Sequence, residues 1–153
     1  SYKKLNAHDI DFAVSIMTPR MTKLFDVHKV TETPLVFIAP KEQPLATLAN
    51  TPMLLPESGD LADIILDTLD KRNITPTIHS YIQGHEAILA MVSAGLGGAI
   101  LPQLVVNNSH LKSKIRVIQT EITLPLIEVG ILCKRSPQDS ASKQAFWNFI
   151  SSQ

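Results

Sequence analysis

The sequence has almost no cysteine, no surplus of charge of either sign and no long apolar run. Cys133 is the one cysteine among 153 residues, which excludes an internal disulfide and, in apolar surroundings, predicts a buried thiol in a reducing compartment. The 14 basic and 14 acidic residues balance, and the scattered Lys and Arg residues form no stripe for a row of phosphates. No apolar run approaches the roughly 18 residues of a membrane-spanning helix. We therefore expect a cytoplasmic chain that by itself contacts neither membrane nor nucleic acid.

The composition is that of a globular protein. Hydrophobic residues make up 44% of the chain and charged residues 18%, which is enough for a core in one domain or in two small lobes. The chain begins with Ser1 instead of an initiator Met, and residues 1–7 resemble the last turns of a helix. We therefore expect that this sequence is a fragment of a longer protein.

Strand and helix patterns alternate through the middle of the chain. Short apolar runs predict strands at residues 53–55, 77–82 and 99–101, and apolar residues at helical spacing predict helices at 61–71 and 86–94. The residues expected to face inward from these helices are Leu61, Ile64, Ile65, Leu69, Ile88, Met91 and Val92. Such an alternation favours a parallel sheet with right-handed crossovers.

Residues that tolerate a left-handed backbone follow both predicted helices. Asn73 and Gly95 stand where a C-terminal cap is expected, and Gly97-Gly98 allows a tight turn before the next strand. This group of glycines follows a helix instead of joining a strand to a helix. It is therefore no dinucleotide-binding fingerprint.

The segments on either side of this alternating region predict further elements and a division into two lobes. Strands are expected at 12–16, 24–31, 35–39, 115–118 and 127–133, a short helix at 103–107, and a final helix at 141–150. We expect Thr33-Pro34 to interrupt the strands and the Pro-rich segment 40–44 to connect two lobes. The first lobe would comprise residues 1–40 and 122–153, and the second residues 41–121, with a crevice between them.

Two strand-to-helix turns are the strongest candidate for a binding site. Residues 57–60 and 83–86 follow neighbouring predicted strands, so both turns belong to the carboxyl edge of the sheet, where ligands bind in α/β proteins. The first backbone amides of a helix lack internal partners and favour a carboxylate or phosphate. The alternative is that both helices are simply capped and packed in the core.

No catalytic or metal-binding constellation is evident. The five histidines, His8, His28, His79, His85 and His110, show no pairing typical of a metal site, and Asp9 and Asp11 are better explained as solvated strand ends than as an acid and base. His85 differs from the others because a helix N-terminus favours its neutral form, which could donate to a ligand. We expect neither enzymatic activity nor a cofactor.

Four segments carry a resemblance to a known family. They are the run Val92-x-Ala94-Gly95-Leu96-Gly97-Gly98-Ala99-Ile100-Leu101-Pro102 and residues 9–14, 34–40 and 84–87. Together they resemble the effector-binding domain of LysR-type transcriptional regulators. The resemblance spans nearly the whole chain. The resemblance implies an α/β fold. The architecture would be a two-lobe regulatory domain of the periplasmic-binding-protein-like type (type 2), with an incomplete first lobe in this chain. The family's winged helix-turn-helix and linker helix, and the domain's first strand and helix, are not in this sequence. At residues 46–47 the family normally has several more residues, so either this loop is short or residues are absent there from the sequence given.

The same resemblance implies a function and partners. A small-molecule inducer would bind in the crevice, the effector domains would form a homo-oligomer (dimer or tetramer), and DNA would be bound only through the N-terminal domain. The sequence looks most like a subset of activators of isoleucine and valine biosynthesis genes, whose inducers, acetolactate and acetohydroxybutyrate, are carboxylates. The alternatives are a solute-binding protein of a transporter, which shares the fold, and a small enzyme.

The resemblance also assigns candidate effector-binding residues. These residues are Ser58, Gly59, Asp60, Gln83, Gly84, His85 and Glu86 from the second lobe, with Met17 and Thr18 from the first. Glu57 and Asp60 are acidic, so we expect them to cap amides or face away from an anionic ligand. The carboxylate of the inducer would then meet backbone amides.

Overall fold

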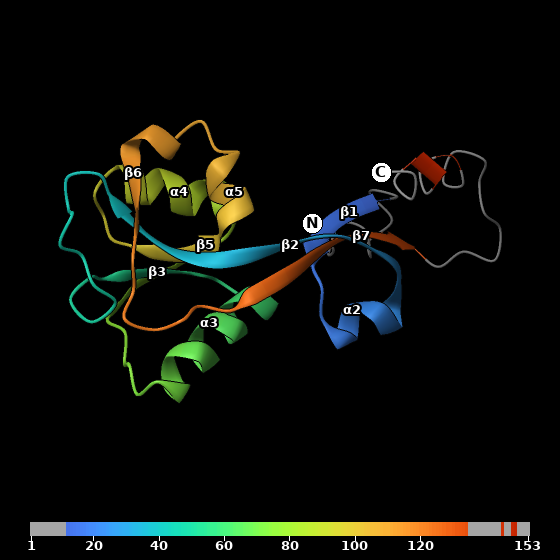
Figure 1. Ribbon diagram of the computed structural model, residues 1–153, viewed down its shortest axis with the longest axis horizontal. Coiled ribbons are helices and arrows are strands. Elements are labelled where there is room, and N and C mark those ends of the chain that lie inside the picture. Colours follow the sequence, from blue (N-terminus) through green and yellow to red (C-terminus); the bar gives the residue numbers. More distant parts are fainter. Residues whose placement is uncertain (1–11, 135–144, 146–147, 150–153) are drawn as a thin grey trace. The chain divides into compact units, whose positions relative to one another are not determined.

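The computed structural model describes residues 12–134, 145, 148 and 149 (Figure 1). Contacts divide the chain into two compact units, Ser1–Glu32 with Glu128–Gln153, and Thr33–Ile127. The sequence-based lobes change at residues 40/41 and 121/122 instead, and these boundaries stay a prediction. Several predictions concern residues outside the described ones. They are the helical end at residues 1–7, the residues His8, Asp9 and Asp11, and most of the final helix.

The first unit is built on strands and one short helix. Its elements are β1 (Phe12–Ile16), α2 (Pro19–Leu24), the first half of β2 (Phe25–Pro40) and most of β7 (Leu126–Lys134). Strand β1 pairs antiparallel with β7, with Phe12 opposite Cys133. Met21, Phe25 and Leu132 form the buried core, and Met17 and Val27 pack against it.

Helix α2 was not predicted from the sequence. Pro19 occupies its first turn, where a missing N–H costs nothing, and Met21 is 1% exposed. The hydroxyl of Thr22 donates to the carbonyl of Pro19, 2.8 Å away. A single buried side chain in a six-residue helix gives too little periodicity to be recognised as a pattern.

The second unit holds two sheets and most of the helices. One sheet pairs the second half of β2 antiparallel with β5 (Ala99–Pro102) and with β6 (Ile115–Ile118). The other pairs β3 (Met53–Pro56) in parallel with β4 (Ile78–Ile82). The helical elements are α3 (Asp60–Lys71), α4 (His85–Ser93), α5 (Gln103–Asn107) and the 3-10 helix η1 (Lys112–Lys114).

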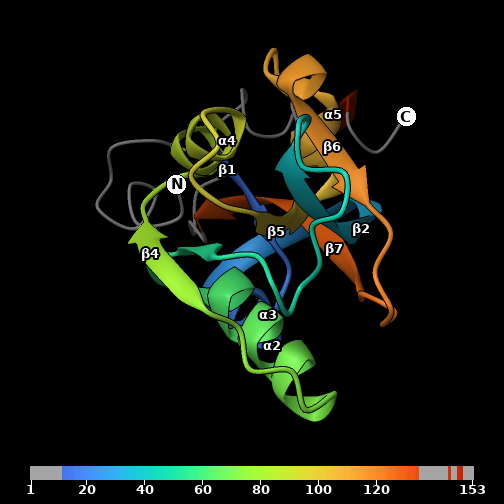
Figure 2. The ribbon, with the colours of Figure 1, turned by 90° about the vertical axis from the view of Figure 1, so that its left-hand side faces the viewer.

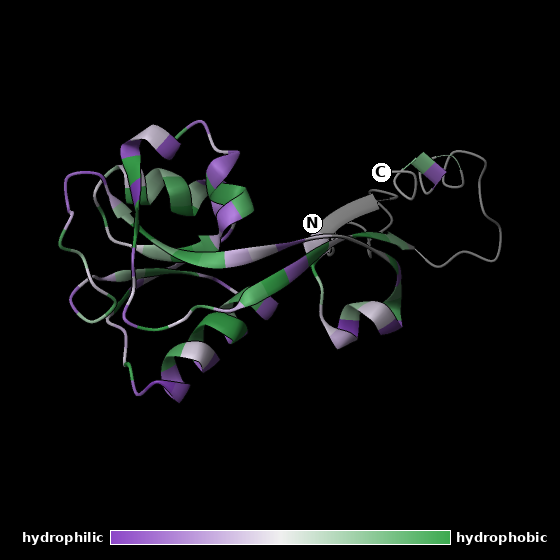
Figure 3. Cartoon of the chain, viewed as in Figure 1, coloured by the Kyte–Doolittle hydropathy of each residue, from purple (hydrophilic) through white to green (hydrophobic). Residues whose placement is uncertain are grey.

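Helices α3 and α4 cover opposite faces of β3, which lies between them in Figures 1 and 2. Every residue of β3 and of β5 is buried, as expected for strands covered on both faces. Figure 3 shows the hydrophobic residues of this unit gathered on β2, β3 and α4, in the interior of the fold.

The apolar faces of α3 and α4 follow the predicted spacing in part. Leu61, Ile65 and Leu69 are buried on α3 as predicted, together with Ala62, whereas Ile64, which was also predicted to face inward, is only half-buried. On α4, Leu89 is buried and Met91 only half-buried, since the face is rotated by part of a turn from the predicted one.

Both predicted helix ends are confirmed. Asn73 has a φ of 56°, and Gly95 has a φ of 86°. The amides of Asn73 and Ile74 donate to the carbonyls of Asp70 and Leu69, so the last turn of α3 closes on its own carbonyl groups.

The predicted interruption at Thr33-Pro34 is wrong, because β2 runs without a break from Phe25 to Pro40. Proline removes only one donor, and the next amide, that of Leu35, donates to the carbonyl of Pro125 at 3.0 Å. The Thr33 hydroxyl also has a role here: it accepts from the amide of Leu104 at 3.0 Å, where α5 begins with Pro102 as its N-cap.

The predicted parallel sheet is confirmed for β3 and β4, which pair in parallel. Strand β5 meets β3 through a single parallel bridge between Met53 and Gly98, and its antiparallel pairing with β2 was not predicted. Two hydrogen bonds join Gly98 to β3 and the residue before it. The Gly98 amide donates to the Pro52 carbonyl at 2.9 Å, and the Leu54 amide donates to the Gly98 carbonyl at 2.8 Å. The alternating pattern fixed the order of the elements but contained no information on the partner of β5.

Candidate functional site

The two predicted turns lie side by side. Pro56, the last residue of β3, pairs with Ile82, the last residue of β4. The amide of Glu57 then donates to the carbonyl of Ile82 at 2.9 Å, which ties the two strand ends together. Because the strands are parallel, α3 and α4 both begin at this carboxyl end. The expectation that both turns share one edge of the sheet is met within this unit.

Glycine is the N-cap residue of both helices. Gly59 has a φ of 106° and Gly84 a φ of 92°, conformations that residues with a Cβ rarely adopt. A Cβ built on either glycine would meet nothing within 4 Å, so the space in front of both positions is open. Glycine has no side chain to accept from the first helical amides, so these donors at the positive end of each helix can bind an acceptor from outside.

The side chains around these turns are mostly exposed and acidic. Ser58, Gln83 and Glu86 are exposed, and Asp60 and His85 are half-buried. The carboxylates of Asp60 and Glu86 lie in the first turns of α3 and α4, where they interact favourably with the helix dipoles. An anionic ligand would therefore have to approach the glycine backbone instead of these side chains.

His85 is held toward its neutral form. Burial lowers the pKa of its imidazole below the usual value, and the neighbouring Glu86 carboxylate opposes this effect only in part. The direction of the shift is the one expected from the sequence, but desolvation and not the helix dipole is its main cause. A neutral imidazole can donate one N–H to a ligand oxygen while adding no charge.

Met17 and Thr18 belong to the first unit and follow β1. Met17 is half-buried against the core of that unit, and its amide donates to the carbonyl of Glu128 at 2.8 Å. The Thr18 carbonyl accepts from the amides of Met21 and Thr22 at the start of α2. Both residues therefore have roles in the structure of their own unit, and their part in ligand binding stays a prediction.

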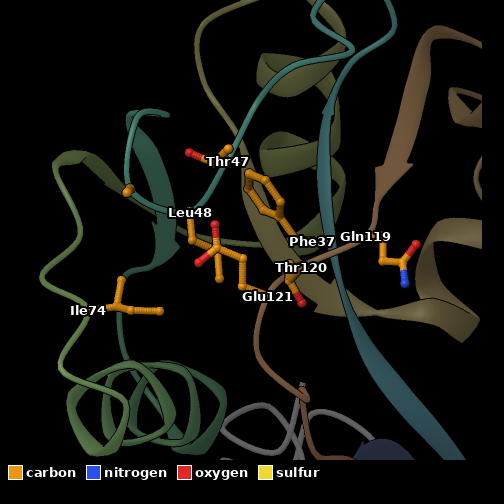
Figure 4. Close-up of a pocket in the computed structure, with 8 residues that line it drawn as sticks. Phe37, Thr47, Leu48, Ile74, Gln119, Thr120 and Glu121 are labelled. Carbon is orange, nitrogen blue, oxygen red and sulfur yellow. The ribbon is translucent and has the colours of Figure 1, made fainter.

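A pocket that the sequence did not reveal lies at the other end of the β3–β4 pair (Figure 4). Its volume is about 120 Å³, and its lining consists of Phe37, Thr47, Leu48, Ala49, Ile74, Gln119, Thr120 and Glu121. The lining comes from four segments that are separate in sequence, and only Phe37 among these residues belongs to a helix or strand. No periodic pattern could have connected them.

The described residues offer no alternative chemistry of metal binding or membrane insertion. In residues 12–134 and the few described beyond them, no three His, Cys, Asp or Glu side chains come together as metal ligands. None of the helices within the same residues combines the length and apolar character that crossing a membrane requires.

Comparisons with known proteins agree on one family. The model of the LysR substrate binding domain family matches residues 1–153. The HTH-type transcriptional activator IlvY of Haemophilus influenzae is 26% identical over 95% of this chain and 53% of its own length, so the chain spans about half of that relative.

Solved structures support the fold. The regulatory domain of CcmR from Synechocystis PCC6803, in complex with 2-PG, superposes with a TM-score of 0.79 at 16% identity, covering 99% of this chain and 76% of that one. The bromide-bound regulatory domain of HypT from Salmonella typhimurium gives 0.78 at 17% identity, covering 99% and 75%. The predicted fold class, an α/β regulatory domain of the periplasmic-binding-protein-like type, is confirmed by these similarities.

Proposed function

The chain belongs to the LysR substrate-binding domain family, and we propose that it senses a small organic acid on behalf of a DNA-binding transcriptional regulator. The observation that carries this proposal is the pair of glycine-capped helix starts at Gly59 and Gly84, joined by the hydrogen bond from Glu57 to Ile82. Two sets of amide donors at one edge of a sheet suit the carboxylate of a small ligand.

The proposed ligands are acetolactate and acetohydroxybutyrate, in keeping with the similarity to the activator IlvY. Each has a carboxylate for the amide groups, and a hydroxyl and a ketone that can pair with side chains such as Ser58, Gln83 and His85. Met17 and Thr18 would complete the site from the first lobe. The regulated genes would be those of branched-chain amino acid biosynthesis.

Ligand binding would act by shifting a conformational equilibrium. A ligand that binds the closed arrangement of two lobes more tightly than the open one shifts the population toward closure by its difference in affinity. In a dimer or tetramer, closure would change the geometry of the N-terminal DNA-binding domains. No observation favours the transporter alternative, whereas a relative that matches 95% of this chain is a transcriptional activator.

A thermal-shift experiment tests the proposal. Acetolactate at tenfold excess over its Kd should stabilise the chain by about 1.4 kcal/mol, which raises Tm by roughly 3–5 °C in a protein of this size. Acetoin, which has the same skeleton without the carboxylate, is the matched control ligand and should have no effect. The absence of a shift with millimolar acetolactate, or an equal shift with acetoin, would contradict the proposal.

Substitution of His85 tests the assigned side chain. His85→Ala should weaken acetolactate binding several-fold, because one donor to the ligand is lost. His110→Ala is the matched control, since His110 is exposed and belongs to the segment between α5 and η1. Equal affinities of the two variants would remove His85 from the site.

A further inference from the structure

The pocket at the amino end of the β3–β4 pair is separate from the turns discussed above. Thr47, Leu48 and Ala49 precede β3, and Ile74 lies between the end of α3 and the start of β4. These residues therefore belong to the end of the two parallel strands opposite Gly59 and Gly84. We infer that this pocket binds a small cation with an apolar body, of the alkylammonium class.

The base of the pocket is apolar and buried. Phe37 is 0% exposed and Leu48 6% exposed, and Ile74 and Ala49 add further apolar surface. An apolar cavity of roughly 150 Å³ can hold a benzene molecule, so a pocket of about 120 Å³ has room for a ligand of comparable or slightly smaller size. A short branched alkyl chain has the apolar character that this base requires, and its ammonium end would extend beyond the base toward Glu121.

The charge of the pocket selects a cation. Among the described residues that line the pocket, Glu121 is the one with a charged side chain. In Figure 4 this side chain extends toward Leu48. An anion would be repelled by this carboxylate, whereas an ammonium group could pair with it.

Two sides of the pocket are held in place before any ligand binds. The Thr47 hydroxyl accepts from the Asn50 amide at 3.1 Å, and the Asn50 side chain accepts from the Thr47 amide at 2.8 Å. On the other side, the Thr120 hydroxyl donates to the carbonyl of Ile122 at 2.6 Å. Both hydroxyl groups are used in local structure, and the Gln119 side chain points away from Leu48 and Ile74 in Figure 4, which leaves Glu121 as the principal polar group for a ligand. The fixed loops lower the entropy cost of binding.

A titration followed by amide NMR tests this inference on the whole chain. The probe is 3-methylbutylammonium, with 3-methylbutan-1-ol and 3-methylbutanoate as neutral and anionic controls. We expect saturable shifts at the amides of Ala49, Ile74 and Thr120 with the ammonium compound, weaker binding of the alcohol, and none of the carboxylate. Tight binding of the carboxylate, or an absence of saturable shifts with the ammonium compound, would overturn the inference.

Three variants separate charge from shape. Glu121→Gln keeps the size of the side chain and should weaken ammonium binding by about three- to fivefold, the range of an exposed ion pair. Glu42→Gln removes an exposed carboxylate outside the pocket and should change nothing. Ala49→Leu adds volume at a surface position and should abolish binding. Unchanged affinity in both Glu121→Gln and Ala49→Leu would refute the site.

The two proposals can fail independently, because acetolactate should instead shift the amide NMR signals of Gly59 and Gly84.

Discussion

The two ends of the β3–β4 pair differ in what they present to a ligand. At the carboxyl end, Gly59 and Gly84 begin two helices with open space in front of them. At the amino end, Phe37 and Leu48 form an apolar pocket bordered by the carboxylate of Glu121. Parallel strands with helical crossovers place helix N-termini at one end and C-termini at the other, so one end favours anions and the other cations. The two proposals therefore assign ligands of opposite charge to the two ends of one small unit.

The largest expected effect comes from Gly98, which pairs with Met53 at the amino end of β3. A Cβ at this position would stand 2.8 Å from Cε2 of Phe37, 2.9 Å from the carbonyl oxygen of Ile38 and 2.9 Å from Cγ2 of Thr51. Gly98→Ala should therefore cost about 3 kcal/mol of stability, at the upper end of overpacking penalties. Urea unfolding followed by circular dichroism measures this loss.

In the fraction of Gly98→Ala protein that stays folded, ligand binding should change only at the amino end of the β3–β4 pair. Displacement of the Phe37 ring changes the pocket, so binding of 3-methylbutylammonium should fall, whereas acetolactate binding should be kept. A loss of stability below 1 kcal/mol would show that the backbone around Gly98 yields easily. Equal loss of both ligands would show that the two ends are not independent.

Gly84→Ala should have an intermediate effect and separate strain from binding. The positive φ of 92° makes a side chain unfavourable by roughly 1–2 kcal/mol, although nothing obstructs the added Cβ. Gly95→Ala is the matched control, because Gly95 has a φ of 86° and equally open space but follows α4. Both variants should lose similar stability, measured by thermal unfolding, and only Gly84→Ala should lose acetolactate affinity. Equal affinities would place the ligand elsewhere.

The smallest expected effect is the pH dependence due to His85. Its pKa is lowered in the folded protein, so below about pH 6.5, the usual pKa of histidine, the unfolded chain binds more protons and stability falls as the pH falls. His85→Gln should lessen the decrease in Tm between pH 7.5 and 5.5. An identical pH profile for His85→Gln and the wild type would mean that His85 titrates normally.

The sequence predicted most of the second unit correctly because its helices and strands have clear periodic patterns. Leu61, Ile65 and Leu69 repeat every four residues, and Asn73 and Gly95 mark the helix ends. Prediction failed where one residue was given too much weight. Pro34 was expected to break β2, but the hydrogen bond from Leu35 to Pro125 allows the strand to continue.

The candidate site was accessible from the sequence, whereas the pocket was not. The turns at 57–60 and 83–86 follow recognisable strands, and the side-by-side position of their ends follows from parallel pairing. The pocket brings together Phe37, Ile74 and Glu121, which are far apart in the chain and share no pattern. Only packing of the folded unit makes them neighbours.

The amino-acid sequence by itself determined the order of the elements from β3 to β5, the inward face of α3, the residues that begin and end α3 and α4, and the family. These properties depend on interactions between residues close in the chain, which local patterns report. The tertiary structure decided that β5 pairs antiparallel with β2, that Gly98 packs against Phe37, and that Glu121 borders an apolar pocket. Those outcomes depend on contacts between distant segments, whose energies arise only when the whole unit packs together.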